Sequence, residues 1–321
     1  MSYTCLACQQ KGNFPTFSVK EMMFGTREEF QYFECAACRS VQLSELLPSE
    51  RIAGYYPADY YSFHKKASDR GAAKLWLYRR RTAHMLGRSD VMGRWFTRMK
   101  PDPRLAILAA AGLRYDHRVL DVGCGSGYLL NELAAGGLSN LVGVDPFIDH
   151  DLRYDNGVLV HKNTLDGLDE SFDFVMFNHS LEHMPDPLEA LRSARARLRD
   201  GGVCMVRIPT SSSAAYQSYG PDWFQLDAPR HILVPSREGM RIMAEKAGLS
   251  LERTIDDSYA ASYWASEQYK RGIALRDPRS YSENPAASIF SQEEIQKFAR
   301  LSDEANRSGK GDQAAFVLRP V

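Results

Sequence analysis

Four cysteines near the N-terminus are spaced as two metal-binding pairs. Cys5-x-x-Cys8 and Cys35-x-x-Cys38 are separated by 26 residues, which is enough for a hairpin or a loop. Two such pairs can place four thiolates tetrahedrally around one Zn²⁺. Because four protein ligands leave no open coordination position, we expect a structural zinc and not a catalytic one. The alternative is a set of buried thiols without a metal.

A glycine-rich loop, D-V-G-C-G-S-G, occupies residues 121–127 between a predicted strand and a predicted helix. Glycines there let the backbone turn sharply and approach a ligand closely. In a doubly wound sheet, ligands bind at the carboxyl ends of the strands, where this loop lies. The dinucleotide fingerprint is G-x-G-x-x-G, but Tyr128 stands where its third glycine would fall. The sequence therefore disfavours a dehydrogenase that binds a pyrophosphate.

The same loop resembles motif I of the class I methyltransferases, in which it surrounds the amino-acid and sulfonium part of S-adenosylmethionine. Residues 171–187 resemble the segment in which the fourth strand of that family runs into the active site. Residues 198–209 resemble a later motif, a helix end followed by the fifth strand. The resemblance covers residues 105 to 257, about half of the chain, and implies an enzyme that uses S-adenosylmethionine.

The resemblance also implies where the cofactor binds. Asp145 would accept hydrogen bonds from both ribose hydroxyls, although it could also be an ordinary surface residue after a glycine turn. Asn163 and Thr164 lie where adenine is usually contacted, without the acidic residue common there. Asn178 and His179 would flank the methionine portion. The expected cofactor-binding residues are Asp121, Gly123, Cys124, Gly125, Gly127, Asp145, Asn163, Thr164, Asn178 and His179.

Methyl transfer is an in-line displacement at a carbon already activated by sulfonium, so the protein must align the nucleophile and remove its proton. Histidine is the natural base near neutral pH. His183 follows the fourth predicted strand beside Glu182, which could orient it. His231 lies on the long segment after the fifth strand, which should overhang the pocket. We expect one of these histidines to act as the base; the alternative for each is a hydrogen bond to a loop backbone.

The order of zinc module, aromatic run (residues 55–63) and methyltransferase core resembles bacterial sugar methyltransferases of polysaccharide and deoxysugar biosynthesis. In the sugar C-methyltransferases of that group, the module and its tyrosines help to wall the substrate pocket. Those enzymes usually carry a further large C-terminal domain, which this chain is too short to contain. We therefore expect a nucleotide-sugar or glycan acceptor but not C-methylation of a keto-sugar. The expected substrate-binding residues are Tyr60, Tyr61, Trp223 and Arg230, with Phe224 as another aromatic candidate.

The stretch from Arg70 to Lys100 holds nine basic residues and a single acidic one, Asp90. One interpretation is recognition of a phosphate on the acceptor. We favour the other, a solvated helix face whose apolar side packs on the core; that side comprises Leu75, Trp76, Met85, Leu86, Trp95 and Phe96.

Two other functions compete with a sugar methyltransferase. An RNA methyltransferase can also carry a zinc module, but residues 1–64 hold five basic and seven acidic residues, and a nucleic-acid-binding module should be basic. The second is a catalytically inactive interaction protein, which the intact glycine loop disfavours.

The candidate site residues must be positioned by the secondary structure of residues 118–321, where short apolar runs alternate with amphipathic stretches. This alternation predicts an α/β fold with a doubly wound, seven-stranded, Rossmann-like sheet, whose last two strands form an antiparallel edge hairpin split by an insertion at about 258–310. The expected domains are a zinc module (1–64), a basic helical connector (65–117) and the methyltransferase domain (118–321). The predicted strands are 118–123, 141–145, 158–161, 172–177, 203–209, 250–256 and 314–320.

The composition is that of an ordinary globular protein. The 321 residues include 40 basic and 40 acidic ones, so the net charge points neither to nucleic acid nor to an anionic membrane. No signal peptide or membrane span is evident. We expect a cytoplasmic enzyme with a small-molecule or carbohydrate partner; the oligomeric state stays open.

Overall fold

The computed structural model describes residues 2–56 and 71–321. Its central sheet has the strand order β13-β14-β11-β10-β6-β7-β9-β8. Neighbours from β9 through β7, β6 and β10 to β11 pair in parallel, whereas β14 pairs antiparallel with both β11 and β13. The strands are β6 (Val119–Val122), β7 (Leu141–Val144), β8 (Leu152–Arg153), β9 (Leu159–His161), β10 (Phe172–Asn178), β11 (Leu198–Pro209), β13 (Leu249–Asp256) and β14 (Gln313–Pro320).

This sheet confirms the predicted α/β methyltransferase fold, including the antiparallel final pair. The sheet also contains β8, a two-residue strand that was not predicted and that pairs antiparallel with β9 at the edge. The chain between β13 and β14 forms α10 (Ala261–Lys270) and α11 (Gln292–Arg307).

Helices cover both faces of the sheet because its central strands are apolar on both sides. Alternate residues of β10 point to opposite faces: Val175 and Phe177 pack with one cluster of buried residues, Phe174 and Met176 with the other. The first cluster includes α7 (Pro187–Arg197) and α9 (Arg237–Lys246), and the second includes α5 (Pro103–Ala110) and α6 (Tyr128–Ala135).

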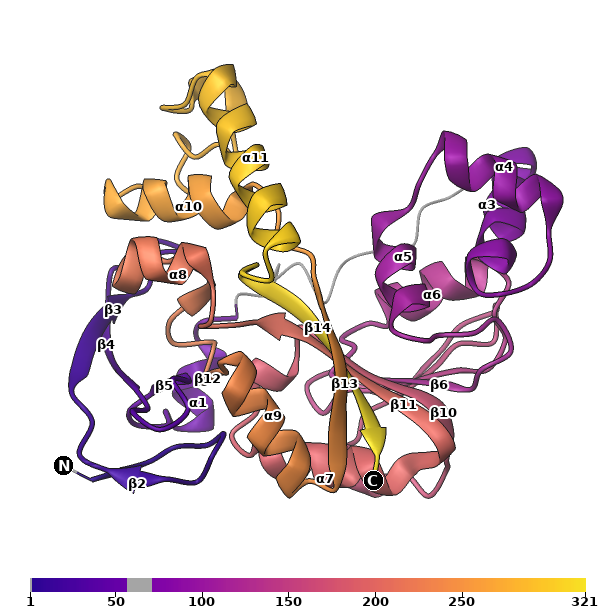
Figure 1. Cartoon of the computed structure of the whole chain (residues 1–321), viewed down its shortest axis with the longest axis horizontal. Coiled ribbons are helices and arrows are strands. Elements are labelled where there is room, and N and C mark those ends of the chain that lie inside the picture. Colours follow the sequence, from indigo (N-terminus) through magenta and orange to yellow (C-terminus); the bar gives the residue numbers. More distant parts are fainter. Residues whose placement is uncertain (1, 57–70) are drawn as a thin grey trace.

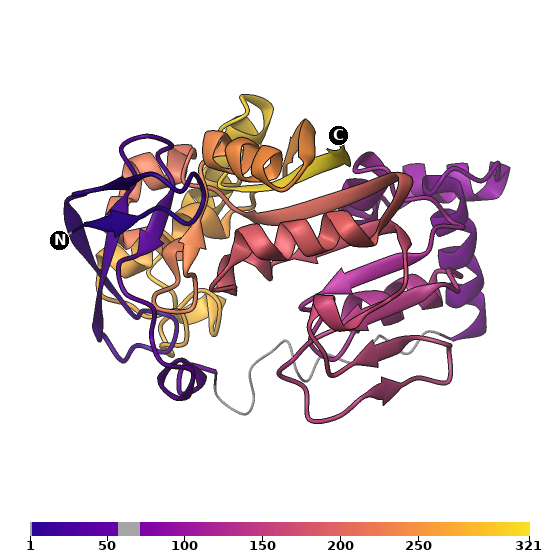
Figure 2. The ribbon, with the colours of Figure 1, turned by 90° about the horizontal axis from the view of Figure 1, so that it is seen from below.

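The N-terminal module shares a sheet and a hydrophobic core with the rest of the molecule. Its sheet has the order β12-β5-β4-β3, so one strand comes from beyond β11. Figure 2 shows its indigo strands beside orange helices of the C-terminal third, and Trp223, Tyr263 and Phe298 are buried in its core. The elements are β1 (Tyr3–Thr4), β2 (Lys11–Gly12), β3 (Thr16–Lys20), β4 (Glu29–Glu34), β5 (Val41–Leu43), α1 (Ser49–Ala53), α8 (Ala214–Tyr219) and β12 (Leu233–Val234).

A helical hairpin of α3 (Ala72–Met85) and α4 (Val91–Met99) lies at the opposite end of the molecule (Figure 1). The two helices approach closely at Gly93, where a Cβ would lie 2.2 Å from the Arg80 carbonyl oxygen. Leu86 is buried, as expected of an apolar side that packs on the core. Trp76 and Trp95 are 47% and 57% exposed, so that expectation is wrong for both tryptophans. Among the described residues, no helix is long and apolar enough to span a membrane.

Candidate active site and metal site

The glycine loop adopts a backbone that only glycine accommodates easily. Gly123, Gly125 and Gly127 have φ values of +72°, +54° and +74°, in the left-handed region. A Cβ at Gly123 would lie 2.6 Å from Cβ of Ser180, and one at Gly127 would lie 2.7 Å from Cγ2 of Val160. The loop therefore turns tightly from β6 into α6, at the carboxyl edge of the sheet.

Two buried carboxylates lie beneath this loop. Asp145, directly after β7, accepts hydrogen bonds from the backbone N–H groups of Gly125 (2.8 Å) and Phe147 (2.9 Å). Burial nevertheless raises its pKa above the usual range. Burial, with a smaller contribution from the charge of Asp145, raises the pKa of Asp121 to about 8. A cationic ligand beside Asp121 would favour its ionised form, so this pair suits a positively charged ligand such as a sulfonium.

The other predicted cofactor residues follow neighbouring strands. Asn163 and Thr164 are exposed directly after β9. Asn178 ends β10, and its Oδ1 accepts a hydrogen bond from Arg207 at 3.2 Å. Arg207 also donates to Nε2 of His179 at 2.6 Å. Cys124 lies within the glycine loop, half-buried. All these positions belong to the carboxyl edge, where a doubly wound sheet binds its ligand.

Glu182 is the most unusual group of the site. Its side chain has no solvent exposure, and within the described residues both carboxylate oxygens lack a hydrogen-bond partner. Oε1 lies 3.5 Å from Nδ1 of His179 and 4.0 Å from Nε2 of His231. Burial opposes ionisation, but His179, His183 and His231 together hold the pKa of Glu182 below its usual value. A buried carboxylate among three histidines can stabilise a proton that arrives on one of them.

The backbone fixes the tautomers of two of these histidines. Nδ1 of His183 lies 2.9 Å from the Arg230 carbonyl oxygen, and Nδ1 of His231 lies 2.7 Å from that of Gln225. A carbonyl can only accept, so each Nδ1 carries the proton and each Nε2 is left as a proton acceptor. The two rings are 4.8 Å apart. Burial, and then the charge of His231, lower the pKa of His183, which keeps this imidazole neutral and able to accept a proton.

Arg207 and Asp257 were not predicted as site residues, but they fix the tautomer of the third histidine, His179. Asp257 accepts from Nε of Arg207 at 2.7 Å. Because a guanidinium only donates, Nε2 of His179 must be unprotonated, and its Nδ1–H faces Glu182. Arg207 is the one charged residue in the apolar run of residues 203–209, a signal that could have identified it.

The structure corrects two predicted substrate residues. Trp223 is 1% exposed, packs in the module core and donates from Nε1 to Asp312 at 3.0 Å. The side chain of Arg230 has no exposure and binds Glu21 (2.9 Å) and Asp227 (2.6 Å) through Nη2. Neither side chain exposes a surface that an acceptor could contact, so the prediction that Trp223 and Arg230 bind the substrate is wrong. Tyr60 and Tyr61 lie outside the described residues.

Arg230 instead joins the module to the loop of His231. Glu21 belongs to the module, where it also accepts hydrogen bonds from the backbone of Phe24 and Thr26. Burial opposes the charge of Arg230, but Asp227 and Glu21 raise the pKa of the guanidinium. The hydroxyl of Tyr32, on β4, donates to the His231 carbonyl oxygen at 2.8 Å. The module thus supports the loop from which His231 projects.

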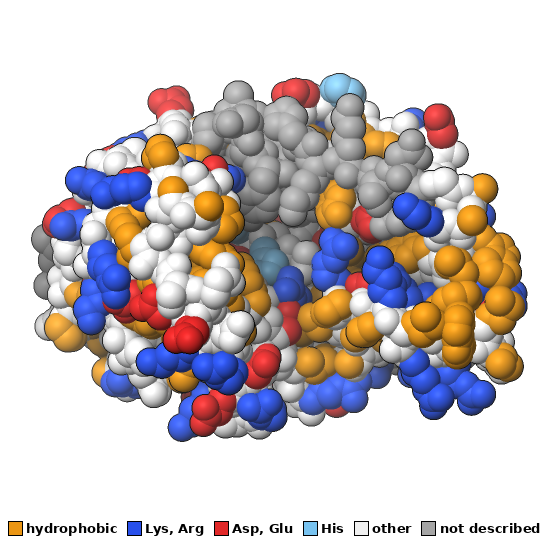
Figure 3. All heavy atoms as spheres, turned by 90° about the horizontal axis from the view of Figure 1, so that it is seen from above, with side chains coloured by type: hydrophobic (Ala, Val, Ile, Leu, Met, Phe, Trp, Pro, Cys, Tyr) orange, Lys and Arg blue, Asp and Glu red, His pale blue; other side chains and the backbone are white. Residues whose placement is uncertain are grey.

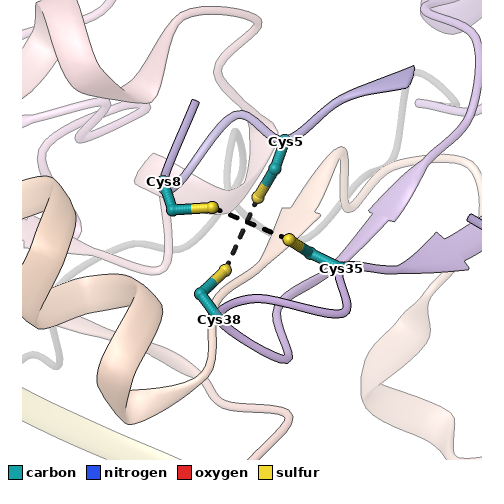
Figure 4. Close-up of side chains that lie close together, drawn as sticks. All are labelled: Cys5, Cys8, Cys35 and Cys38. Carbon is teal, nitrogen blue, oxygen red and sulfur yellow. Dashed lines mark hydrogen bonds between the residues drawn. The ribbon is translucent and has the colours of Figure 1, made fainter. Parts of the chain in front are cut away.

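The four N-terminal cysteines converge on one point (Figure 4). Sγ of Cys5 lies 3.6 Å from that of Cys38, and Sγ of Cys8 lies 3.6 Å from that of Cys35. These distances exclude a disulfide and approach the edge of about 3.8 Å of a tetrahedron with Zn–S bonds of ~2.3 Å. The contact with Cys5 lowers the pKa of Cys38 to about 5, so one thiolate forms readily.

The two cysteine pairs form matching turns. In the first, the Gln9 N–H donates to the Cys5 carbonyl and the Cys5 N–H to that of Gln10; in the second, residues 35, 39 and 40 repeat the pattern. Gln9 and Arg39 have φ values of +65° and +63°. Two equivalent turns that present four sulfur atoms are a possible metal site.

Comparison with known proteins identifies the family of this chain. The model of a family described as a methyltransferase domain matches residues 92–254, half of the chain. The chain is 32% identical to the ubiquinone biosynthesis O-methyltransferase of Haemophilus ducreyi over 117 residues, which are 32% of this chain and 49% of that protein. It is 27% identical to the tRNA U34 carboxymethyltransferase of Aeromonas hydrophila over 191 residues, 52% of this chain and 54% of that protein.

The chain thus spans about half the length of the curated relatives it matches. An S-adenosylmethionine-dependent methyltransferase of known structure from Mesorhizobium loti aligns with a TM-score of 0.44 and 16% identity, covering 68% of this chain and 98% of that one. Because the family model matches half of its length, the chain belongs to the methyltransferase-domain family.

Proposed function

We propose that this enzyme methylates a sugar-like small molecule, a nucleotide-sugar or a glycan, with a histidine as general base. The observation that carries the base is Glu182, a buried carboxylate without a hydrogen-bond partner among the described residues, which faces His179 and His231. A buried carboxylate without a hydrogen bond is costly, and such sites are commonly functional.

The cofactor would bind over the glycine loop. S-adenosylmethionine supplies an activated methyl group when bound. Asp121 and Asp145 offer carboxylates to its cationic and ribose parts, Asn163 and Thr164 border the adenine region, and Asn178 and His179 face the methionine end. The support is their shared position at the carboxyl edge of the sheet and the Cβ-free turn of the loop.

The acceptor proton would pass to Nε2 of His183 or His231. Both atoms are free of the backbone bonds that occupy Nδ1. Protonated His231 would lie 4.0 Å from Glu182 and 3.9 Å from Asp227, two carboxylates that stabilise an imidazolium. Glu182 therefore does not need to touch the acceptor; it makes proton acceptance by the histidines favourable.

The sugar-like acceptor is supported by the place where the module meets the site. The hydroxyl of Tyr56 lies 3.1 Å from Nδ1 of His183, so an aromatic residue of the N-terminal segment lies directly beside the candidate base. Aromatic side chains there would stack on a sugar or nucleotide ring. The same module would hold one structural Zn²⁺ on its four cysteines.

A second candidate is an RNA methyltransferase, because one of the relatives acts on tRNA. The acidic excess of residues 1–64 argues against the module as an RNA-binding surface. A third candidate is a catalytically inactive interaction protein. Calorimetry that detects no binding of S-adenosylmethionine would support it.

The test is incubation of the enzyme with methyl-labelled S-adenosylmethionine and separate panels of nucleotide-sugars, glycans and transfer RNA. We expect label in the nucleotide-sugar or glycan fraction. Label confined to RNA would replace the proposed acceptor. Label in no fraction, together with cofactor binding, would reject the acceptor class and leave the enzyme assignment standing.

A further inference from the structure

The exposed face of α4 carries large apolar side chains that do not pack against the rest of the fold. Val91, Trp95 and Met99 recur every four residues along one side of the helix, and they are 72%, 57% and 65% exposed. Met92 extends the stripe and is 42% exposed. The opposite side of α4 contacts α3 at Gly93. The stripe is therefore left over after the hairpin has formed.

This apolar stripe lies within a strongly basic hairpin. Residues 72–100 contain eight basic residues and one acidic residue, Asp90, although the chain as a whole is neutral. Asp90 is already paired, with Nε of Arg80 at 3.0 Å. Among the described residues, Arg94, Arg98 and Lys100 make no ion pair and are exposed. Figure 3 shows this lobe with hydrophobic and basic side chains gathered beside one another.

We propose that α4 is a membrane-docking helix that lies on an anionic lipid surface. Trp95, Met99 and Val91 would enter the boundary between headgroups and acyl chains, while Arg94 and Arg98 would bind lipid phosphates. Tryptophan suits that boundary because its large ring carries one polar N–H. Charge complementarity selects this occupant, since anionic lipid supplies both the negative surface and the apolar layer.

Two other occupants fit less well. A second copy of this chain would bring two such basic hairpins face to face, which like-charge repulsion opposes. RNA would satisfy the basic residues, but it offers nothing to the aliphatic stripe of Val91, Met92 and Met99.

The hairpin is well placed to transmit docking to the active site. It packs on the cluster that contains α5 and α6. Arg104 of α5 donates to the hydroxyl of Tyr128, the first residue of α6 after the glycine loop, at 3.3 Å. Figure 3 shows a hollow between the lobe that carries α3 and α4 and the rest of the molecule. This hollow opens on the face on which the basic and apolar side chains of that lobe are seen. A docked enzyme would thus hold its cofactor loop close to the lipid surface.

The test measures co-sedimentation of the full chain with phosphatidylcholine vesicles that contain or lack phosphatidylglycerol. We expect binding only with the anionic lipid, weakened by salt. Arg94→Glu with Arg98→Glu should reduce affinity by roughly 25-fold or more, from about fivefold for each charge. Trp95→Ser with Met99→Ser should reduce it by about tenfold or more for each side chain.

The matched control reverses two exposed charges on α11, Lys297→Glu with Arg300→Glu, and should bind vesicles as the wild type does. S-adenosylmethionine binding by every variant shows that it is folded. No binding of wild type to anionic vesicles overturns the proposal, as does equal loss in the α11 control. Tighter binding to an RNA oligonucleotide than to vesicles overturns it in favour of RNA, and a dimer that Trp95→Ser with Met99→Ser dissociates overturns it in favour of a second copy. The vesicle and dimer outcomes leave the proposed methyl transfer untouched, whereas tight RNA binding would also favour the RNA methyltransferase over a sugar-like acceptor.

Discussion

The cysteine site and the Glu182 site are both built from segments distant in the sequence, but they differ in how their polar atoms are satisfied. Around the cysteines, four sulfur atoms lie within 4.8 Å of one another, so together they could supply all four ligands of one metal ion. Around Glu182, two carboxylate oxygens lack hydrogen bonds in the described residues, and the Nε2 atoms of His183 and His231 are free of backbone bonds. A closed ligand set serves structure, whereas an incompletely satisfied one is left for chemistry.

The largest expected effect is loss of the closed site. Cys35→Ser should abolish binding of the proposed zinc and unfold the module, because structural zinc contributes about 10 kcal/mol or more in small modules. Turnover should disappear too, since β12 joins the module sheet directly after the loop of His231. Zinc content and thermal unfolding measure this. Cys204→Ala, outside the site, should keep its zinc; a metal-free Cys35→Ser that stays folded and active would contradict the comparison.

The open site should respond in the opposite way. Glu182→Gln should lower turnover by about 10²- to 10⁴-fold, the usual contribution of acid–base catalysis. Its melting temperature should fall only modestly, because the favourable charge interaction with the histidines that lower the pKa of Glu182 is lost, while the cost of burying that charge is removed as well. A large fall in melting temperature with normal turnover would make Glu182 a structural residue instead.

A buried but fully paired charge should behave like the closed site. Arg230→Met leaves Glu21 and Asp227 buried without their cation, so unfolding free energy should fall by about 3–5 kcal/mol. Denaturant titration measures it. Arg241→Met is the matched control, because its ion pairs are on the surface of α9 and its loss should leave the midpoint unchanged. Equal effects of the two substitutions would refute the role of Arg230 in holding the module.

The smallest effect concerns pH. Since the pKa of Asp121 is raised from 3.8 to about 8, its contribution to the stability of the cofactor-free protein is present below about pH 4 and is lost as the pH rises towards 8. Asp121→Asn stays neutral and does not lose it. The difference in melting temperature between variant and wild type should therefore grow from pH 5 to pH 9; a constant difference would show that Asp121 is ionised throughout.

Local patterns were enough to predict the sheet and the glycine loop. Residues 121–127 reveal their turn through glycine spacing, and the central strands are continuous apolar runs. The convergence of the cysteine pairs was also predictable, because their spacing matches a known ligand geometry. Each of these features is indicated by a short local pattern, although the two cysteine pairs themselves are 26 residues apart.

Long-range partners were not predictable. Arg230 appeared to be a substrate residue because its partner Glu21 lies 209 positions away. Trp223 was predicted to line the substrate pocket, because no local pattern indicates that its partner is Asp312, 89 positions away. The pairing of β12 with β5 has the same character, since a two-residue strand carries no periodicity.

The central claim is that His183 or His231, supported by Glu182, takes the proton from the methyl acceptor beside the cofactor loop. It is tested most directly by single-turnover methyl transfer from labelled S-adenosylmethionine in wild type, His183→Gln and His231→Gln, with cofactor affinity measured in parallel by calorimetry. We predict that at least one variant loses methyl transfer by a hundredfold or more while it binds the cofactor as the wild type does. Wild-type methyl transfer in both variants would contradict the account.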